Sequence, residues 1–173
     1  MTIPNKEVRG IYVTRVVRWV TKKLNIDPDD YRSFIALLIH QQIDQFKEML
    51  QEYLLHSTSY DDLSREKDYH NLMGGLLAPL VSNYTIKSNQ ESGLGRCDHI
   101  LTPIAGRSDH AIIIEYKVVK DKKELDLIAK AGLEQIQAKK YEATIKQQPH
   151  VKKISKISLA FCGKEVAMHY SIE

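Results

Sequence analysis

The sequence predicts an α/β fold with a mixed central sheet, in the order helix, three strands, helix and two strands, behind an N-terminal helical extension. Two observations support this fold class. Apolar residues recur at helical spacing up to about residue 82, whereas from Asn83 onward they follow the alternation of strands. A long polar helix then separates the third strand from the fourth, and a crossover helix in this place is typical of a mixed sheet.

The first 60 residues contain helical patterns only. Residues 8–24 carry valines and aromatic residues at helical spacing. Asp27-Pro28-Asp29-Asp30 then predicts a break and a new helix start, because proline and acidic residues favour a first turn. One continuous helix is expected from about Tyr31 to Leu55, and a polar break follows it.

A further helix is expected over about Asp61–Leu80, with acidic residues at its start and Pro79 near its end. The Gly74-Gly75 pair falls inside it. Glycine is unfavourable in a helix interior, so the pair indicates close packing against another element or a local irregularity.

The remaining pattern consists of five short strands and one helix. Glycine-containing segments at 91–95 and 106–110 separate the first three strands, and Cys162–Glu165 predicts a hairpin turn between the last two. The expected strands are Tyr84–Asn89, Arg96–Ile104, Ala111–Lys120, Ile154–Phe161 and Val166–Ser171, and the expected helix is Lys122–Lys146.

The composition is that of a globular intracellular protein. Charged residues make up 27% and hydrophobic residues 43% of the 173 positions, which excludes wholesale disorder. The net charge of +3 is compatible with a polyanionic substrate without requiring one. Cys97 and Cys162 form no metal-binding pair and suggest reduced thiols. With no signal peptide and no apolar run long enough for a bilayer, we expect a cytoplasmic protein that makes no membrane contact.

The strand Ala111–Lys120, with the sequence AIIIEYKVVK, carries two charges on a face that is otherwise apolar. Because side chains alternate along a strand, Glu115 and Lys117 share a face with Ile113. Burying charge is costly unless a partner is present. Two interpretations are open at this point: an edge strand or cross-strand ion pair that discourages aggregation, or part of a functional site.

Asp98 favours the second interpretation. If the second and third strands pair as a hairpin, Asp98 lies close to Glu115 and Lys117. Two carboxylates forced together repel each other unless a cation is present, and Mg²⁺ or Mn²⁺ prefers such oxygen ligands and keeps several waters. A bound metal can activate one of those waters and neutralise charge on a phosphodiester, while Lys117 can position the water or stabilise the negative transition state.

This D-x₁₆-E-x-K pattern resembles the signature of the PD-(D/E)XK nuclease superfamily, and in more detail a bacterial family in which that domain follows an AAA-ATPase-like domain. The resemblance implies a restriction-endonuclease-like core over residues 61–173, with residues 1–60 forming a helical extension at the junction to a missing ATPase-like domain. The matching stretches are IPNKEVR at 3–9, REKDYHNLMGGLL at 65–77, ESGLGRCDHIL at 91–101, IIIEYKV at 112–118 and LEQIQAKKY at 133–141.

The resemblance also implies further site residues. Glu66 matches an acidic position that assists the metal in this superfamily, so the implied metal ligands are Asp98, Glu115 and Glu66; a solvated helix acid is the open alternative. Gln135 matches the second-helix motif and completes the implied catalytic set with Lys117. Three other residues have open roles: His70 is site-contacting or structural, Tyr141 belongs to the same motif but lies off the helical face of Gln135, and Arg96 contacts phosphate or caps the turn.

The function expected from these residues is metal-dependent hydrolysis of nucleic acid, DNA in particular. The alternative is a catalytically silent nuclease-fold module that binds nucleic acid or a partner protein. The chain has no Walker-type glycine loop and therefore no nucleotide-binding machinery of its own. Residues 1–60 are then expected to support a homodimer or to contact a partner ATPase.

Overall fold

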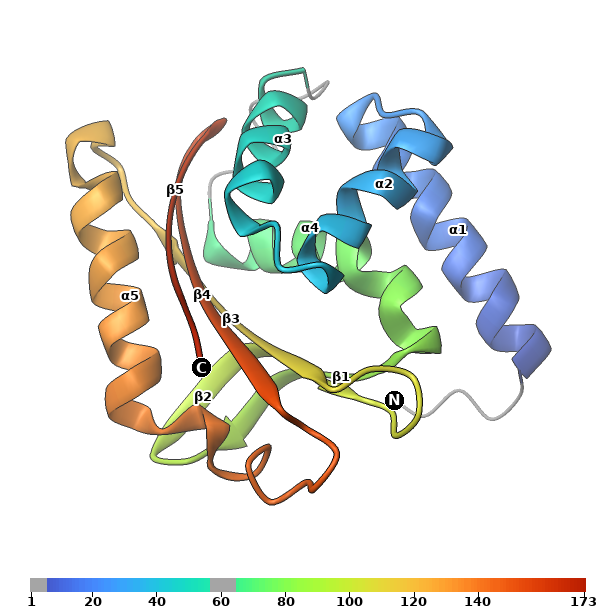
Figure 1. Cartoon of the computed structure of the whole chain (residues 1–173). Coiled ribbons are helices and arrows are strands. Elements are labelled where there is room, and N and C mark those ends of the chain that lie inside the picture. The colour runs from blue at the N-terminus through green and yellow to red at the C-terminus, as the bar shows by residue number, and fades with distance from the viewer. Residues whose placement is uncertain (1–5, 57–64) are drawn as a thin grey trace.

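The computed structural model describes residues 6–56 and 65–173, which are arranged around a five-stranded mixed sheet (Figure 1). The strands lie in sequence order, and all neighbours are antiparallel except β3 and β4, which are parallel. The predicted order of helix, three strands, helix and two strands is confirmed. The strands are β1 Tyr84–Ser92, β2 Gly95–Pro103, β3 His110–Val118, β4 Lys153–Cys162 and β5 Glu165–Ile172.

Helices cover both faces of the sheet. The crossover helix α5 lies on one face, and the N-terminal helices lie on the other (Figure 1). Short 3-10 turns flank α4 and α5, at Ala78–Ser82, Lys122–Glu124 and Tyr141–Ala143. The α-helices are α1 Lys6–Leu24, α2 Pro28–Ile39, α3 Ile43–His56, α4 Glu66–Leu77 and α5 Leu125–Lys139.

The alternation of β3 divides the interior into two hydrophobic cores. Ile112, Ile114 and Tyr116 pack into the larger core, together with α1–α4. Ala111 and Ile113 point the other way, into the core beneath α5. The face assignment made from the strand pattern is confirmed, and it places Glu115 and Lys117 on the α5 side.

The single helix predicted over Tyr31–Leu55 is wrong: the chain forms two helices there, α2 and α3. Gln41 adopts a left-handed φ of 61° between them. The cause is tertiary packing, because the rings of Phe34 and Phe46 stack with centroids 4.7 Å apart. In one continuous helix these two residues would stand about 18 Å apart. The predicted start at Asp27 is confirmed, since its side chain caps α2 by accepting from the Asp29 N–H.

Helix α4 ends at Leu77, earlier than predicted, and the chain continues as a 3-10 turn through Pro79. The predicted start of this helix falls on residues 57–64, outside the described residues. Gly75 does mark close packing: a Cβ there would lie 2.6 Å from Cγ2 of Val20 on α1.

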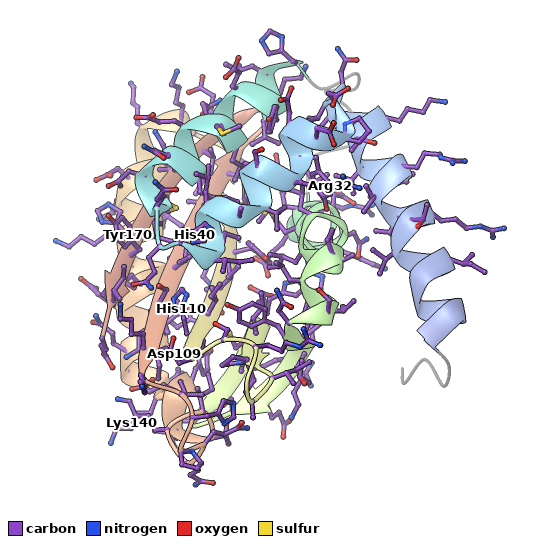
Figure 2. All side chains as sticks on the ribbon, turned by 45° about the vertical axis from the view of Figure 1, so that its right-hand side comes forward. Arg32, His40, Asp109, His110, Lys140 and Tyr170 are labelled. Atoms are coloured by element: carbon purple, nitrogen blue, oxygen red, sulfur yellow. The ribbon has the colours of Figure 1, made fainter. Side chains whose placement is uncertain are left out.

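The crossover helix α5 also ends earlier than predicted, at Lys139 rather than Lys146. Lys140, labelled in Figure 2 at the end of α5, has a left-handed φ of 52°. The two-residue turn between β1 and β2 docks against this helix end, where the Leu94 N–H donates to the Lys139 carbonyl at 2.7 Å. This hydrogen bond satisfies a carbonyl that the helix leaves unpaired. The turn predicted between the last two strands is confirmed, because Cys162 pairs with Glu165 around Gly163.

Helices α1–α3 are not separate from the rest of the described structure. Val20, Phe34 and Leu50 share one hydrophobic core with α4 and the sheet. The division of the chain at residue 60 stays a prediction. Within the described ranges, the helices are all too short or too polar to cross a membrane.

Candidate active site

The candidate site lies where β2 and β3 separate. These strands pair only through His99–Leu101 and Ile112–Ile114, whereas β3 remains paired with β4 along its whole length. Asp98 and Glu115 are the first residues beyond the last pair, one on each strand. The fork therefore brings together two acidic residues that lie 17 positions apart in the sequence.

Asp98 bridges the fork through its side chain. Its Oδ2 accepts a hydrogen bond of 2.8 Å from the backbone N–H of Tyr116, the residue after Glu115. The carboxylate thus takes the place of a strand partner, and this contact orients it. The hairpin expected to carry Asp98 toward Glu115 is present.

The carboxylate of Glu115 is buried, with only 5% of its side chain exposed. Its Oε1 accepts two hydrogen bonds, from Lys117 Nζ at 2.8 Å and from Gln135 Nε2 at 2.6 Å. Its Oε2 is buried without a hydrogen-bond partner. Burial raises the pKa of Glu115; the neighbouring Lys117 opposes this, and the charge of Asp98 adds to it.

Lys117 is the cation of the site. Burial lowers the pKa of its ammonium group, but the hydrogen bond and the charge of Glu115 outweigh burial, and Glu66 and Asp98 contribute in the same direction. The net result is a raised pKa, so Lys117 stays protonated at neutral pH. It is therefore suited to stabilise negative charge and unsuited to act as a base.

Helix α5 positions Gln135 by a close approach to the sheet. A Cβ on Gly132 would stand 2.1 Å from the Oγ of Ser158, which faces Glu115 across the β3–β4 ladder. Only a glycine lets the helix come this near. Gln135, on the next turn, then reaches Glu115, as expected for the site-facing residue of α5.

Tyr141 also reaches the site, although the spacing within an uninterrupted helix argued against it. Since α5 ends at Lys139 and Lys140 reverses the chain, the Tyr141 hydroxyl returns toward Gln135 and accepts from its Nε2 at 3.3 Å. The same hydroxyl donates to the Arg96 carbonyl at 2.7 Å. Helical periodicity could not reveal this contact; among the signals in the sequence, only the family motif pointed to Tyr141.

Three further sequence candidates lie around this cluster. Glu66 is exposed on the first turn of α4, and its charge contributes to the raised pKa of Lys117. His70 contacts the backbone of the site rather than its carboxylates: its Nε2 lies 3.4 Å from the backbone carbonyl of Asp98 and 2.9 Å from Ser88 Oγ. Arg96 is mostly exposed, with its guanidinium 4.0 Å from a carboxylate oxygen of Glu91.

The strand carrying Asp98 also presents His99, which sequence reasoning missed. His99 is buried on the opposite face, where its ring stacks on His70 with centroids 4.5 Å apart. Burial, together with the neighbouring His70, lowers the pKa of His99 to about 3. Side chains alternate between the two faces of a strand, so the sequence could have placed His99 on the face opposite Asp98.

A model of a known protein family, described as the PD-(D/E)XK nuclease superfamily, matches residues 64–170. The chain belongs to the PD-(D/E)XK nuclease superfamily. The matched region contains the fork and the whole cluster around it. No curated protein matches the chain.

Nucleases of the PD-(D/E)XK superfamily typically use divalent metals such as Mg²⁺, which prefer oxygen ligands. The unpartnered Oε2 of Glu115 is a free oxygen ligand, and Asp98 supplies a second carboxylate at the same fork. Among residues 6–56 and 65–173, no three His, Cys, Asp or Glu side chains form a ready-made ligand set. Mg²⁺ often binds through one or two carboxylates and keeps its waters, so the cluster fits this mode.

Proposed function

We propose that the chain is a metal-dependent nuclease that hydrolyses phosphodiester bonds of nucleic acid, DNA in particular. The observation that carries the proposal is the state of Glu115. One of its oxygens accepts from Lys117 and Gln135, whereas the other is buried without a partner. An orphaned carboxylate oxygen is costly to bury, and a cation would compensate for it.

In this proposal Asp98 and Glu115 hold Mg²⁺ or Mn²⁺, and Glu66, which forms no ready-made ligand set with them, would join them by moving or through a retained water. When bound, the metal lowers the pKa of a coordinated water and neutralises charge on the phosphate. Glu115 offers its free Oε2, while the hydrogen bonds to its Oε1 fix the orientation of the carboxylate. Asp98 is oriented in the same way by the Tyr116 N–H.

Lys117 and Gln135 act on the reacting groups differently. The ammonium group of Lys117 has three protons, one of which is donated to Glu115. Another can be donated to a phosphate oxygen as negative charge develops there. Gln135 positions Glu115 and is itself held by Tyr141. Mutation of such supporting residues commonly lowers metal affinity or activity by about 10- to 100-fold.

The proposal is tested by incubating purified protein with single- and double-stranded DNA in Mg²⁺ or Mn²⁺. We expect cleavage by the wild-type chain and none by Asp98→Asn or Lys117→Ala. Glu134→Gln is a matched control, because Glu134 is exposed on the same helix as Gln135. Cleavage that persists in both site variants would remove the basis of the assignment.

A catalytically silent module is the second candidate, and one observation favours it. Lys117 already pairs with Glu115, so part of the acidic charge is neutralised without a metal. Calorimetric titration with Mn²⁺ separates the two candidates. A nuclease should bind the ion in the wild type and lose it in Glu115→Gln, whereas a silent module should bind none and remain stable.

We further propose that residues 1–60 provide a partner surface, either for a second copy of the chain or for an ATPase. On helix α1, Ile11 has 59% and Trp19 48% of its surface exposed to solvent. Exposed apolar side chains of this kind mark interaction sites when they are grouped. Light scattering of wild type and Ile11→Asp tests the homodimer: a mass of one chain in both would exclude it.

A further inference from the structure

A second concave site lies on the face of β2 opposite the carboxylates. It is a groove of about 490 Å³ between α1, α4 and the β1–β2 hairpin. This volume lies within the range of small-molecule sites. Its lining combines an apolar part, which includes Val16, Trp19 and Ile86, with a polar part, which includes His70, Ser88 and His99.

The polar part of the groove contains two stacked imidazole rings. His70 and His99 stack with ring centroids 4.5 Å apart, and Tyr116 meets both rings edge-on from the core side. His99 is 2% exposed, and its Nδ1 has no hydrogen-bond partner. That nitrogen is closed off from the groove, whereas the Nε2 of the same ring faces Gly74, 3.4 Å from where a Cβ would stand, and a ligand with a hydrogen-bonding edge can reach it there.

Gly74 explains why the groove exists. A Cβ at this position would meet only His99, at an ordinary contact distance of 3.4 Å, so packing does not demand glycine here. Glycine nevertheless occupies this interior helical position, where alanine is the better helix former. The absence of a side chain at Gly74 leaves space at the bottom of the groove. The adjacent Gly75, by contrast, is required by the contact with α1.

The chemistry of the lining selects the ligand. None of the described residues that line the groove is Lys, Arg, Asp or Glu, so a charged group would find no counter-charge. The aromatic side chains in the lining favour stacking with a planar ring, and Ser88 and His99 can form hydrogen bonds with the polar atoms at the edge of that ring. We propose that this groove binds a neutral planar heteroaromatic ring of the nucleobase type. The groove lies on the other face of β2 from the carboxylates, and its proposed ligand takes no part in the cleavage chemistry.

The test uses Trp19, which is the only tryptophan of the chain and lines the groove. Adenosine, cytidine and thymidine are titrated into the intact protein while tryptophan emission is followed, with ribose 5-phosphate as the base-free control. We expect a saturable change for at least one nucleoside and none for ribose 5-phosphate. Asp98→Asn should retain this binding, which separates the groove from the cleavage site.

Gly74→Leu places a side chain in the groove and should weaken binding at least tenfold. Gly74→Ala serves as the second variant if leucine disturbs the fold, with a smaller loss of affinity. Short single-stranded oligonucleotides with bases and the same chains without bases distinguish a base within a strand from a free nucleoside. Absence of any saturable change, equal binding to Gly74→Leu, or equally tight binding of indole would overturn the proposal.

Discussion

The substitution Gly132→Ala tests how closely α5 must approach the sheet. The added methyl group would lie 2.1 Å from Ser158 Oγ and 3.2 Å from its Cβ. The helix must then withdraw by roughly 1 Å, and overpacking of this kind costs about 1–3 kcal/mol. Alanine recovers up to about 1 kcal/mol of helix propensity. With the full propensity gain, we expect a net loss of about 0–2 kcal/mol in the free energy of unfolding, measured by urea denaturation.

The same displacement should reach the site, because Gln135 lies one turn beyond Gly132 and donates to Glu115 at 2.6 Å. Misplacement of a positioning group by about 1 Å can cost about 100-fold in rate. We therefore expect cleavage to fall by about 10- to 100-fold.

A double-mutant cycle isolates the contact. Ser158→Ala alone should be neutral or slightly stabilising, because its hydroxyl is buried without a partner. Combined with Gly132→Ala, it should restore most of the stability and the cleavage. Gly10→Ala is the matched control, since a Cβ there meets nothing within 4 Å. Strictly additive effects, or a fully active Gly132→Ala, would show that α5 does not approach β4 in this way.

Three other changes have clear expected outcomes. Gly74→Ala should raise the free energy of unfolding by about 0.5–1 kcal/mol, whereas Gly75→Ala should lower it because its methyl group meets α1 at 2.6 Å; urea denaturation of both decides. Lys156→Met should cost about 3 kcal/mol in thermal or urea unfolding, because it removes the buried cation that pairs with Glu142 at 3.2 Å. The raised pKa of Glu115 means that the folded state favours its protonated form. Without metal, the free energy of unfolding should therefore fall as pH rises through that pKa. The fall should be smaller in Glu115→Gln, and Mn²⁺ should reverse it in the wild type.

The sheet and the position of the site could be predicted from the sequence because burial forces a simple pattern there. β3 is buried on both faces, so an unbroken apolar run identifies it, and a charged pair inside that run stands out. The glycine turn before Asp98 then sets the hairpin that carries this residue to the fork.

The helix boundaries could not be predicted, because tertiary contacts decide them. Nothing around Gln41 is a strong helix breaker, yet stacking of Phe34 on Phe46 requires the chain to reverse there. Lys140 adopts a left-handed conformation without being glycine, and the β1–β2 turn binds the Lys139 carbonyl just before it. Tyr141 reaches Gln135 as a consequence of that boundary, so an error in the helix end becomes an error in the site.

The two proposed sites are coupled by the geometry of one strand. Asp98 accepts from the Tyr116 N–H at the fork and His99 lines the groove beside α4, so consecutive residues of β2 serve both sites. His70 links them, because its ring stacks on His99 while its Nε2 lies 3.4 Å from the Asp98 carbonyl. A ligand that shifts this pair of rings would move the backbone at Asp98, and with it the hydrogen bond that orients the carboxylate toward Glu115. Occupancy of the groove should therefore alter the affinity of the carboxylate pair for Mn²⁺, and by linkage the metal should alter nucleoside binding by the same factor.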